Sequence, residues 1–229
     1  MLAAALAAAG CGGTPLMYLP GTTVASRRLA AFPSDGIYWT FYADGKMKVA
    51  REGSVTARAN VDESIAYRVQ QHGGQVFRAP ALENLPYAPA FHEWAFDSLV
   101  EIMDERRGRA HRKHGSVGDW VFRTSLARWR TELNADYVLV SAFSDGHNTP
   151  QRQIGLVFGG GLRALRPAIT CAVQLQTGRI VWCNFFQDFQ GGDLLGRAGA
   201  QELADGLLEP MLRAGDGAPL EPPPPPAPR

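Results

Sequence analysis

A chain of 229 residues with 45% hydrophobic and 20% charged residues has the length and composition of one globular domain with a substantial core. Its formal net charge of +1 excludes a global electrostatic attraction to nucleic acid or to anionic lipid. No apolar stretch of the sequence reaches the ~20 residues that a membrane-spanning helix requires, which excludes a helical membrane span.

The chain opens on small apolar residues that end at Ala8-Ala9-Gly10-Cys11. An apolar segment that ends in small residues is typical of a secretory signal and its cleavage site. A cysteine directly after such a segment resembles the lipobox of bacterial lipoproteins, in which the signal is removed and the cysteine carries the lipid. The resemblance implies a signal peptide over residues 1–10, lipidation of Cys11 and, because Gly12 rather than Asp follows, the outer membrane. The alternative is an Ala-rich terminus with a chance cysteine.

A tether is expected over residues 11–30, where Gly, Pro and Thr are frequent. Residues 37–42 and 46–49 then predict a hairpin, because Asp44-Gly45 readily adopts the positive φ angles of a tight turn. The following apolar residues recur at helical spacing, and Gly73-Gly74 is expected to end the helix that carries them. These apolar residues are Val61, Ile65 and Val69. A short strand is expected over residues 75–78.

Two further helices are predicted before the centre of the chain. An apolar stripe that includes Phe91, Leu99 and Ile102 predicts a helix over residues 91–107. A second stripe, from Phe122 to Leu133, predicts another helix that packs on the sheet, with Asp119 or Ser116 as its N-terminal cap.

A polar and basic segment separates these two helices and is expected to be a solvated loop. Its side chains form a possible interaction surface, made of Arg109, His111, Arg112, Lys113 and His114. The two histidines are three residues apart, but the surrounding positive charge opposes the binding of a metal cation. We therefore expect no metal site here.

Residues 134–189 are expected to form the centre of the sheet. Apolar runs rich in β-branched and aromatic residues predict strands over residues 137–143, 169–175 and 180–189. The intervening residues 144–152 are predicted to be irregular, with His147 in a turn.

The C-terminal part is predicted to be a helix followed by a tail. Leu203, Leu207 and Met211 indicate a helix over residues 193–212, which Pro210 is expected to kink or end. A proline-rich tail follows over residues 214–229. The folded domain, over residues 31–213, is then of the α/β (α+β) class, with a mixed, largely antiparallel sheet and helices packed on it.

Cys171 and Cys183 lie in the two strands of the central hairpin. A three-residue loop over 176–178, with Gly178 left-handed, would place the two cysteines directly opposite each other and allow a disulfide. A two-residue loop would place them on opposite faces of the sheet. The alternative to a disulfide is two buried thiols that act as small hydrophobic residues.

No motif of known catalytic chemistry is present. Gly159-Gly160-Gly161 lacks the Lys-Ser/Thr that a phosphate-binding loop requires, and Gly-x-Ser-x-Gly is absent. We therefore expect no enzymatic activity and no cofactor.

Three motifs carry a family resemblance. Residues 134–140, which follow a helix, and residues 172–184, which contain Gln176-Thr177-Gly178-Arg179, resemble a group of uncharacterised bacterial envelope lipoproteins. Gly192-Asp193-Leu194 before an Ala- and Leu-rich helix is similar to that group as well. More distantly, the chain looks like the α/β domain of curli-secretion-channel (CsgG-like) lipoproteins and the N-terminal domain of TolB. The resemblance covers about residues 91–212 and implies fold and location more than activity.

Together these features predict a lipid-anchored envelope protein that faces the periplasm. Its role is expected to be non-catalytic, in binding, scaffolding or assembly, with protein partners in the envelope and no nucleic-acid partner. A second hypothesis is an oligomeric subunit of a secretion or export assembly, with contacts through sheet edges or residues 144–167. A third, an envelope enzyme, requires polar residues that converge in a pocket.

Overall fold

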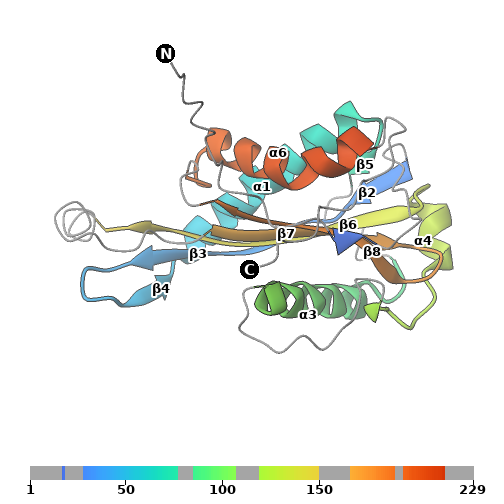
Figure 1. Cartoon of the computed structure of the whole chain (residues 1–229), viewed down its shortest axis with the longest axis horizontal. Coiled ribbons are helices and arrows are strands. Elements are labelled where there is room, and N and C mark those ends of the chain that lie inside the picture. Colours follow the sequence, from blue (N-terminus) through green and yellow to red (C-terminus); the bar gives the residue numbers. More distant parts are fainter. Residues whose placement is uncertain are drawn as a thin grey trace, which may run out of the picture.

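The computed structural model describes residues 17–18, 28–76, 85–106, 119–149, 166–188 and 193–214. These residues form three layers. Helices α1 (Arg51–Gln71) and α6 (Arg197–Ala214) cover one face of a central sheet, and α3 (Ala88–Arg106) lies against the other (Figure 1). The predicted fold class, a mixed and largely antiparallel sheet with helices packed on it, is confirmed.

The described residues contribute eight strands to one sheet. The strands are β1 (Met17–Tyr18), β2 (Leu29–Ala31), β3 (Asp35–Phe41), β4 (Met47–Val49), β5 (Gln75–Val76), β6 (Tyr137–Asn148), β7 (Arg166–Gln174) and β8 (Arg179–Asp188). The main path runs β1-β8-β7-β6-β2-β5, and β3 joins it by pairing with β6. Strands β6, β7 and β8 are antiparallel neighbours, whereas β2 and β3 run parallel to β6. Strand β1 lies within the range predicted as a tether and pairs with β8.

Strand β6 is longer than predicted, because β3 supports its second half. Its first residues pair with β2, and Ala142 to Asn148 pair with β3. The irregular segment predicted from Ser144 is therefore wrong as far as Asn148, and His147 lies in a strand rather than a turn. Polar residues can continue this strand because β3 supplies a complete ladder of hydrogen-bonding partners. The predicted β3–β4 hairpin is confirmed, and Gly45 in its turn has a φ of +82°.

Successive side chains of β6 point to opposite faces of the sheet, so the strand divides the hydrophobic core into two parts. Val138 and Val140 face the α3 side, while Tyr137 and Leu139 face α1 and α6. Helices cover both faces of the first half of this strand, which accounts for the largely apolar run from Tyr137 to Phe143.

The predicted helices around Val61 and Phe91 are confirmed as α1 and α3. Apolar residues at helical spacing, including Val61, Ile65 and Val69, face the sheet from α1. The chain leaves α1 through Gly73, whose φ of +77° is the left-handed conformation expected after a helix. Among the described residues, no helix combines the length and the hydrophobicity needed to cross a membrane.

The helix predicted up to Leu133 is much shorter than expected. Helix α4 covers only Ala127–Glu132, and its N-terminal cap residue is Leu126 rather than Asp119 or Ser116. The residues before it are extended because they pair with the β7–β8 hairpin. Phe122 donates its N–H to the Gly178 carbonyl at 2.9 Å, and the Trp120 carbonyl accepts the N–H of Ile180 at 3.0 Å.

Helix α6 continues through Pro210 instead of ending there. Proline has no N–H, so the Gly206 carbonyl loses its usual partner within the helix. Asn184 of β8 replaces that partner, since its amide donates to the carbonyls of Gly206 and Leu207, both at 2.9 Å. Gly206 also lies against the Phe186 ring, at a distance where a Cβ atom would overlap the ring, so a glycine allows close packing of α6 on the sheet.

Candidate functional site

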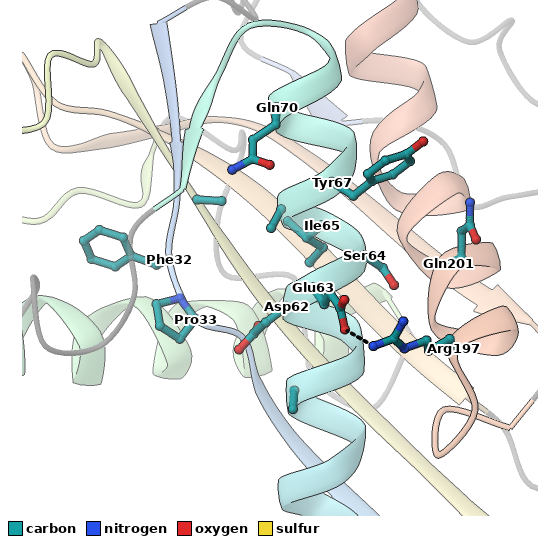
Figure 2. A pocket seen from close by; sticks show the side chains of 13 residues that line it. Phe32, Pro33, Asp62, Glu63, Ser64, Ile65, Tyr67, Gln70, Arg197 and Gln201 are labelled. Atoms are coloured by element: carbon teal, nitrogen blue, oxygen red, sulfur yellow. Dashed lines mark ion pairs between the residues drawn. The ribbon is translucent and has the colours of Figure 1, made fainter.

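A pocket of about 950 Å³ lies along α1 and is called the α1 pocket here (Figure 2). Its walls come from the β2–β3 connection, from α1 and from the start of α6. The lining residues are Ala31, Phe32, Pro33, Ala59, Asp62, Glu63, Ser64, Ile65, Ala66, Tyr67, Gln70, Arg197 and Gln201. This lining mixes apolar, aromatic, amide and charged groups.

The wall on the β2 side is a bulge in the sheet. Strands β2 and β3 pair with the same edge of β6, but three residues, Phe32 to Ser34, stand opposite only Val140 and Ser141. An extra residue in a strand leaves a backbone group without a ladder partner. Pro33 has no N–H, and the N–H of Ser34 is turned away from β6.

Asp62 of α1 satisfies that N–H. Its carboxylate accepts the Ser34 N–H at 2.7 Å. Burial of the carboxyl raises the pKa of Asp62 above its ordinary value of 3.8, and the Ser34 hydrogen bonds and the nearby Arg58 charge oppose this effect. Asp62 is therefore a partly desolvated acid at the wall of the pocket.

The α6 side of the pocket is polar and more exposed. Figure 2 shows Glu63 and Tyr67 on the side of α1 that is nearer to Arg197 and Gln201. Glu63 and Arg197 form an ion pair at 3.3 Å, with both side chains mostly in solvent. Such a pair contributes only about 0–1 kcal/mol to stability. Tyr67 is 52% exposed, so its ring and hydroxyl are available at this surface.

The arrangement of the α1 pocket suits binding more than catalysis. Asp62 points toward the bulge while Glu63 points toward Arg197, so the two carboxyl groups do not share a site. The residues that line the pocket include no His, Cys or Lys that could act with them as a base or a nucleophile. Elsewhere in the part of the chain that the structure describes, no group of three or more His, Cys, Asp or Glu is placed to hold a metal ion.

A second polar cluster fixes the turn before α6. Tyr38 donates its hydroxyl hydrogen to Asp193 at 2.6 Å, and Asp145 accepts the Leu194 N–H at 3.3 Å. The amide of Asn60 donates to the carbonyls of Leu194 and Leu195 at 3.0 and 2.9 Å. The Asp193-Leu194 motif of the sequence is thus a structural anchor that holds α6 on the sheet.

Cys171 and Cys183 are directly opposite each other on β7 and β8. Their Cα atoms are 4.0 Å apart and their sulfur atoms form a disulfide. The loop differs from both loops considered from the sequence, because Gln174 pairs with Arg179 and four residues therefore form the turn. A bulge after Ala172 then shifts the pairing by one residue, which brings Cys171 opposite Cys183. Gly178 is left-handed, as expected, with a φ of +68°.

The other sites expected from the sequence lie outside the described residues. These are Cys11 and the basic surface formed by Arg109, His111, Arg112, Lys113 and His114.

Sequence reasoning did not identify Asp62. The residue lies next to Val61 on an amphipathic helix, where a carboxylate normally indicates a solvated face. The available signal was Pro33-Ser34 directly after an apolar run, because a proline next to a strand indicates a bulge or an edge.

Comparisons with known proteins give a weak structural likeness. No protein-family model matches the chain, and none of the curated proteins matches it in sequence. A variant of the PelC dodecamer from Paraburkholderia phytofirmans is similar at 13% identity and a TM-score of 0.39, over 89% of this chain and 98% of that chain. The PelC dodecamer in another space group has 13% identity and a TM-score of 0.37, over 89% and 97% of the two chains. The C-terminal domain of LpoB from Salmonella enterica has 14% identity and a TM-score of 0.28, over 75% and 87%. Scores this low do not establish a shared activity.

Proposed function

We propose that this chain is a lipid-anchored bacterial envelope protein that faces the periplasm from the outer membrane and has a non-catalytic binding or assembly role. The observation that carries the proposal is the sequence Ala8-Ala9-Gly10-Cys11 at the end of a short apolar segment. Fatty acyl chains on Cys11 would supply the anchor, because each buried methylene contributes about 0.8 kcal/mol to membrane binding.

A lipid at Cys11 would hold the domain close to the membrane. Strand β1 begins at Met17, only a few residues further along the chain. An extended chain covers at most ~3.6 Å per residue, so the β1–β8 edge of the sheet would lie within roughly 20 Å of the lipid. The role of the domain would then be exercised at the membrane surface.

Two features of the described residues support the proposal. The α1 pocket presents an aromatic ring, amides and a partly buried carboxylate without a catalytic partner, which suits the recognition of a ligand or a peptide segment. The disulfide between Cys171 and Cys183 suits an oxidising compartment such as the periplasm.

Metabolic labelling with a palmitate analogue, followed by membrane fractionation, tests the anchor. The wild-type protein should incorporate the label and sediment with the outer membrane, and Cys11→Ala should lose both properties. The matched control is the double variant Cys171→Ala and Cys183→Ala, which removes the other two thiols and should still be labelled. Unlabelled wild-type protein in the soluble fraction would contradict the proposal.

A further inference from the structure

The α6 side of the α1 pocket lies between two helices that run parallel. The amide of Asn60 on α1 contacts the Leu194 carbonyl just before α6 begins. Three residues further along both segments, Glu63 of α1 pairs with Arg197 of α6. Because these contacts advance in the same direction, the two helices are aligned side by side, and Figure 2 shows them so. This side of the pocket, called the helix seam here, therefore follows the line between α1 and α6.

The helix seam presents hydrogen-bond donors beside an exposed aromatic ring. The ring of Tyr67 extends from α1 toward α6 and is 52% exposed (Figure 2). Among the described residues, none forms a hydrogen bond with the side chain of Tyr67 or of Gln201, which also lines the pocket. Arg197 pairs with Glu63 through one nitrogen, but its side chain is 82% exposed, so its other N–H groups face solvent. The seam thus offers one ring and three donor side chains to a ligand.

A proline-rich segment is a ligand that suits this chemistry. Proline has no N–H, so a run of prolines presents carbonyl acceptors and no backbone donor. Proline-rich peptides are generally recognised by grooves that aromatic side chains line. An anionic ligand is disfavoured, because Glu63 lies beside Arg197 and Asp62 adds a second carboxyl group to the lining. The helix seam therefore suits an uncharged ligand that carries acceptors along an extended chain.

The chain carries such a segment beyond α6. Helix α6 ends at Ala214, and residues 215–229 lie outside the described residues. They include five consecutive prolines, from Pro222 to Pro226. Because each proline fixes φ near about −65°, a run of prolines favours the polyproline II conformation before it meets a partner. The sequence therefore predicts a ligand that loses little conformational entropy when it binds.

The proline run can reach the helix seam. Gln201 stands about 20 Å from Ala214 along α6, at a rise of ~1.5 Å per residue. Residues 215–221 span roughly 24 Å when extended, so Pro222 can return as far as Gln201. One helical turn, from Arg197 to Gln201, lines the seam on the α6 side and is about 6 Å long. Two or three residues of polyproline II cover that length at ~3.1 Å each, so five prolines are sufficient.

We infer that the proline run of this chain, Pro222 to Pro226, occupies the helix seam of its own α1 pocket. A short tether gives the run an effective concentration on the order of 1 mM at the seam. A contact with an intrinsic dissociation constant of ~0.1 mM would then be about 90% closed. The inference rests on the binding role proposed for this pocket and not on the lipid at Cys11. Palmitate labelling tests the anchor separately, so the two proposals fail in different experiments.

Competition between the tail and a free peptide tests the inference. A fluorescent peptide of residues 218–229 is titrated with two versions of the 229-residue chain, both carrying Cys11→Ser, and binding is followed by anisotropy. One version keeps its prolines. The other, called the serine-tail protein here, has each residue from Pro222 to Pro226 replaced by serine. The peptide should bind the serine-tail protein with an apparent dissociation constant about tenfold lower, because the intact tail competes for the seam.

Two tyrosine substitutions in the serine-tail protein locate the bound peptide. Tyr67→Ala should weaken peptide binding at least about fivefold, because a tyrosine ring contributes strongly to such contacts. The matched control is Tyr87→Ala, which removes an equally exposed tyrosine directly before α3, the helix on the other face of the sheet, and should leave binding unchanged. Equal affinity for the intact-tail and serine-tail proteins would overturn the inference. So would a Tyr67→Ala protein that binds the peptide as tightly as its parent.

Cross-linking shows which copy of the chain supplies the prolines. In the Cys11→Ser background, Gln201→Cys and Ala227→Cys in one chain should be joined by a short bis-maleimide, and the product should have the intact mass of one chain plus one linker. In the control pair, Val100→Cys on α3 replaces Gln201→Cys and should give little product. A covalent dimer would show that the tail of a second copy fills the seam and would overturn the inference, as would equal cross-linking of the two pairs.

Discussion

At the scale of single residues, the disulfide between Cys171 and Cys183 is the strongest covalent constraint in the described residues. Both cysteines are buried in the core on the α3 side. Closing a loop of this length stabilises a fold by about 3 kcal/mol in the chain-entropy view. The pair therefore contributes a substantial part of the stability of a typical domain.

Thiol counting tests this constraint. Denatured protein without reductant should show no maleimide adduct on Cys171 or Cys183, and reductant should add two adducts. The double alanine variant should lose about 3 kcal/mol of unfolding free energy. If both cysteines react before reduction, they are free thiols that only fill the core.

Asp62 should give the fold an unusual pH dependence. Because burial raises its pKa above 3.8, the folded protein holds this proton more tightly than the unfolded chain does. Its contribution to stability is therefore fully present below pH 3.8 and is lost as the pH rises through the raised pKa. Asp62→Asn keeps an oxygen that accepts the Ser34 N–H but cannot ionise.

Thermal unfolding from acid to neutral pH measures this effect. The stability of the wild-type protein relative to Asp62→Asn should increase as the pH falls. Asp44 provides a control of opposite sign, because its hydrogen bonds with Lys46 lower the pKa of its carboxyl. The wild-type protein should therefore lose stability relative to Asp44→Asn as the pH falls. A pH-independent difference between wild type and Asp62→Asn would contradict the burial of this acid.

At the scale of elements, α6 depends on a side chain from the sheet. Asn184 donates to the Gly206 carbonyl, the group that Pro210 leaves without its usual donor. Removal of the amide leaves a buried acceptor unsatisfied, at a cost of about 1–3 kcal/mol. Asn184→Ala should destabilise the protein by that amount.

The same substitution should cost less in a Pro210→Ala background, because residue 210 can then donate its N–H to Gly206. Chemical denaturation of the wild type, the two single variants and the double variant gives the coupling energy, expected at about 1 kcal/mol. Equal costs of Asn184→Ala in both backgrounds would show that Pro210 is unrelated to this hydrogen bond.

Local sequence patterns predicted the elements whose own residues determine them. The apolar spacing of Val61, Ile65 and Val69 identified α1, and Asp44-Gly45 identified the β3–β4 turn. Patterns failed where a distant partner determines the conformation. The polar end of β6 is a strand because β3 pairs with it, and Trp120 to Phe122 are extended because the β7–β8 hairpin binds them.

At the scale of the whole molecule, the sheet has two faces with different roles. Helices α1 and α6 cover one face of the central part of the sheet and, with the β2–β3 bulge, form the α1 pocket. The other face is covered by α3 over only part of its length. The pocket could not be predicted from the sequence, because it depends on a parallel pairing between segments more than 100 residues apart, Asp35–Phe41 and Ala142–Asn148.

The proposed role of the α1 pocket depends on the compartment that holds the domain. If Cys11 carries the lipid, the pocket lies within a short distance of a membrane. The identity of the mature N-terminus is thus the fact on which the proposed function depends most.

The mature N-terminus is identified directly by the intact mass of the protein after detergent extraction from bacterial membranes. The account predicts a chain that begins at Cys11 and carries additional mass from acyl chains, and a Cys11→Ala protein that lacks this mass. An unmodified chain that retains Met1 to Gly10 would contradict it.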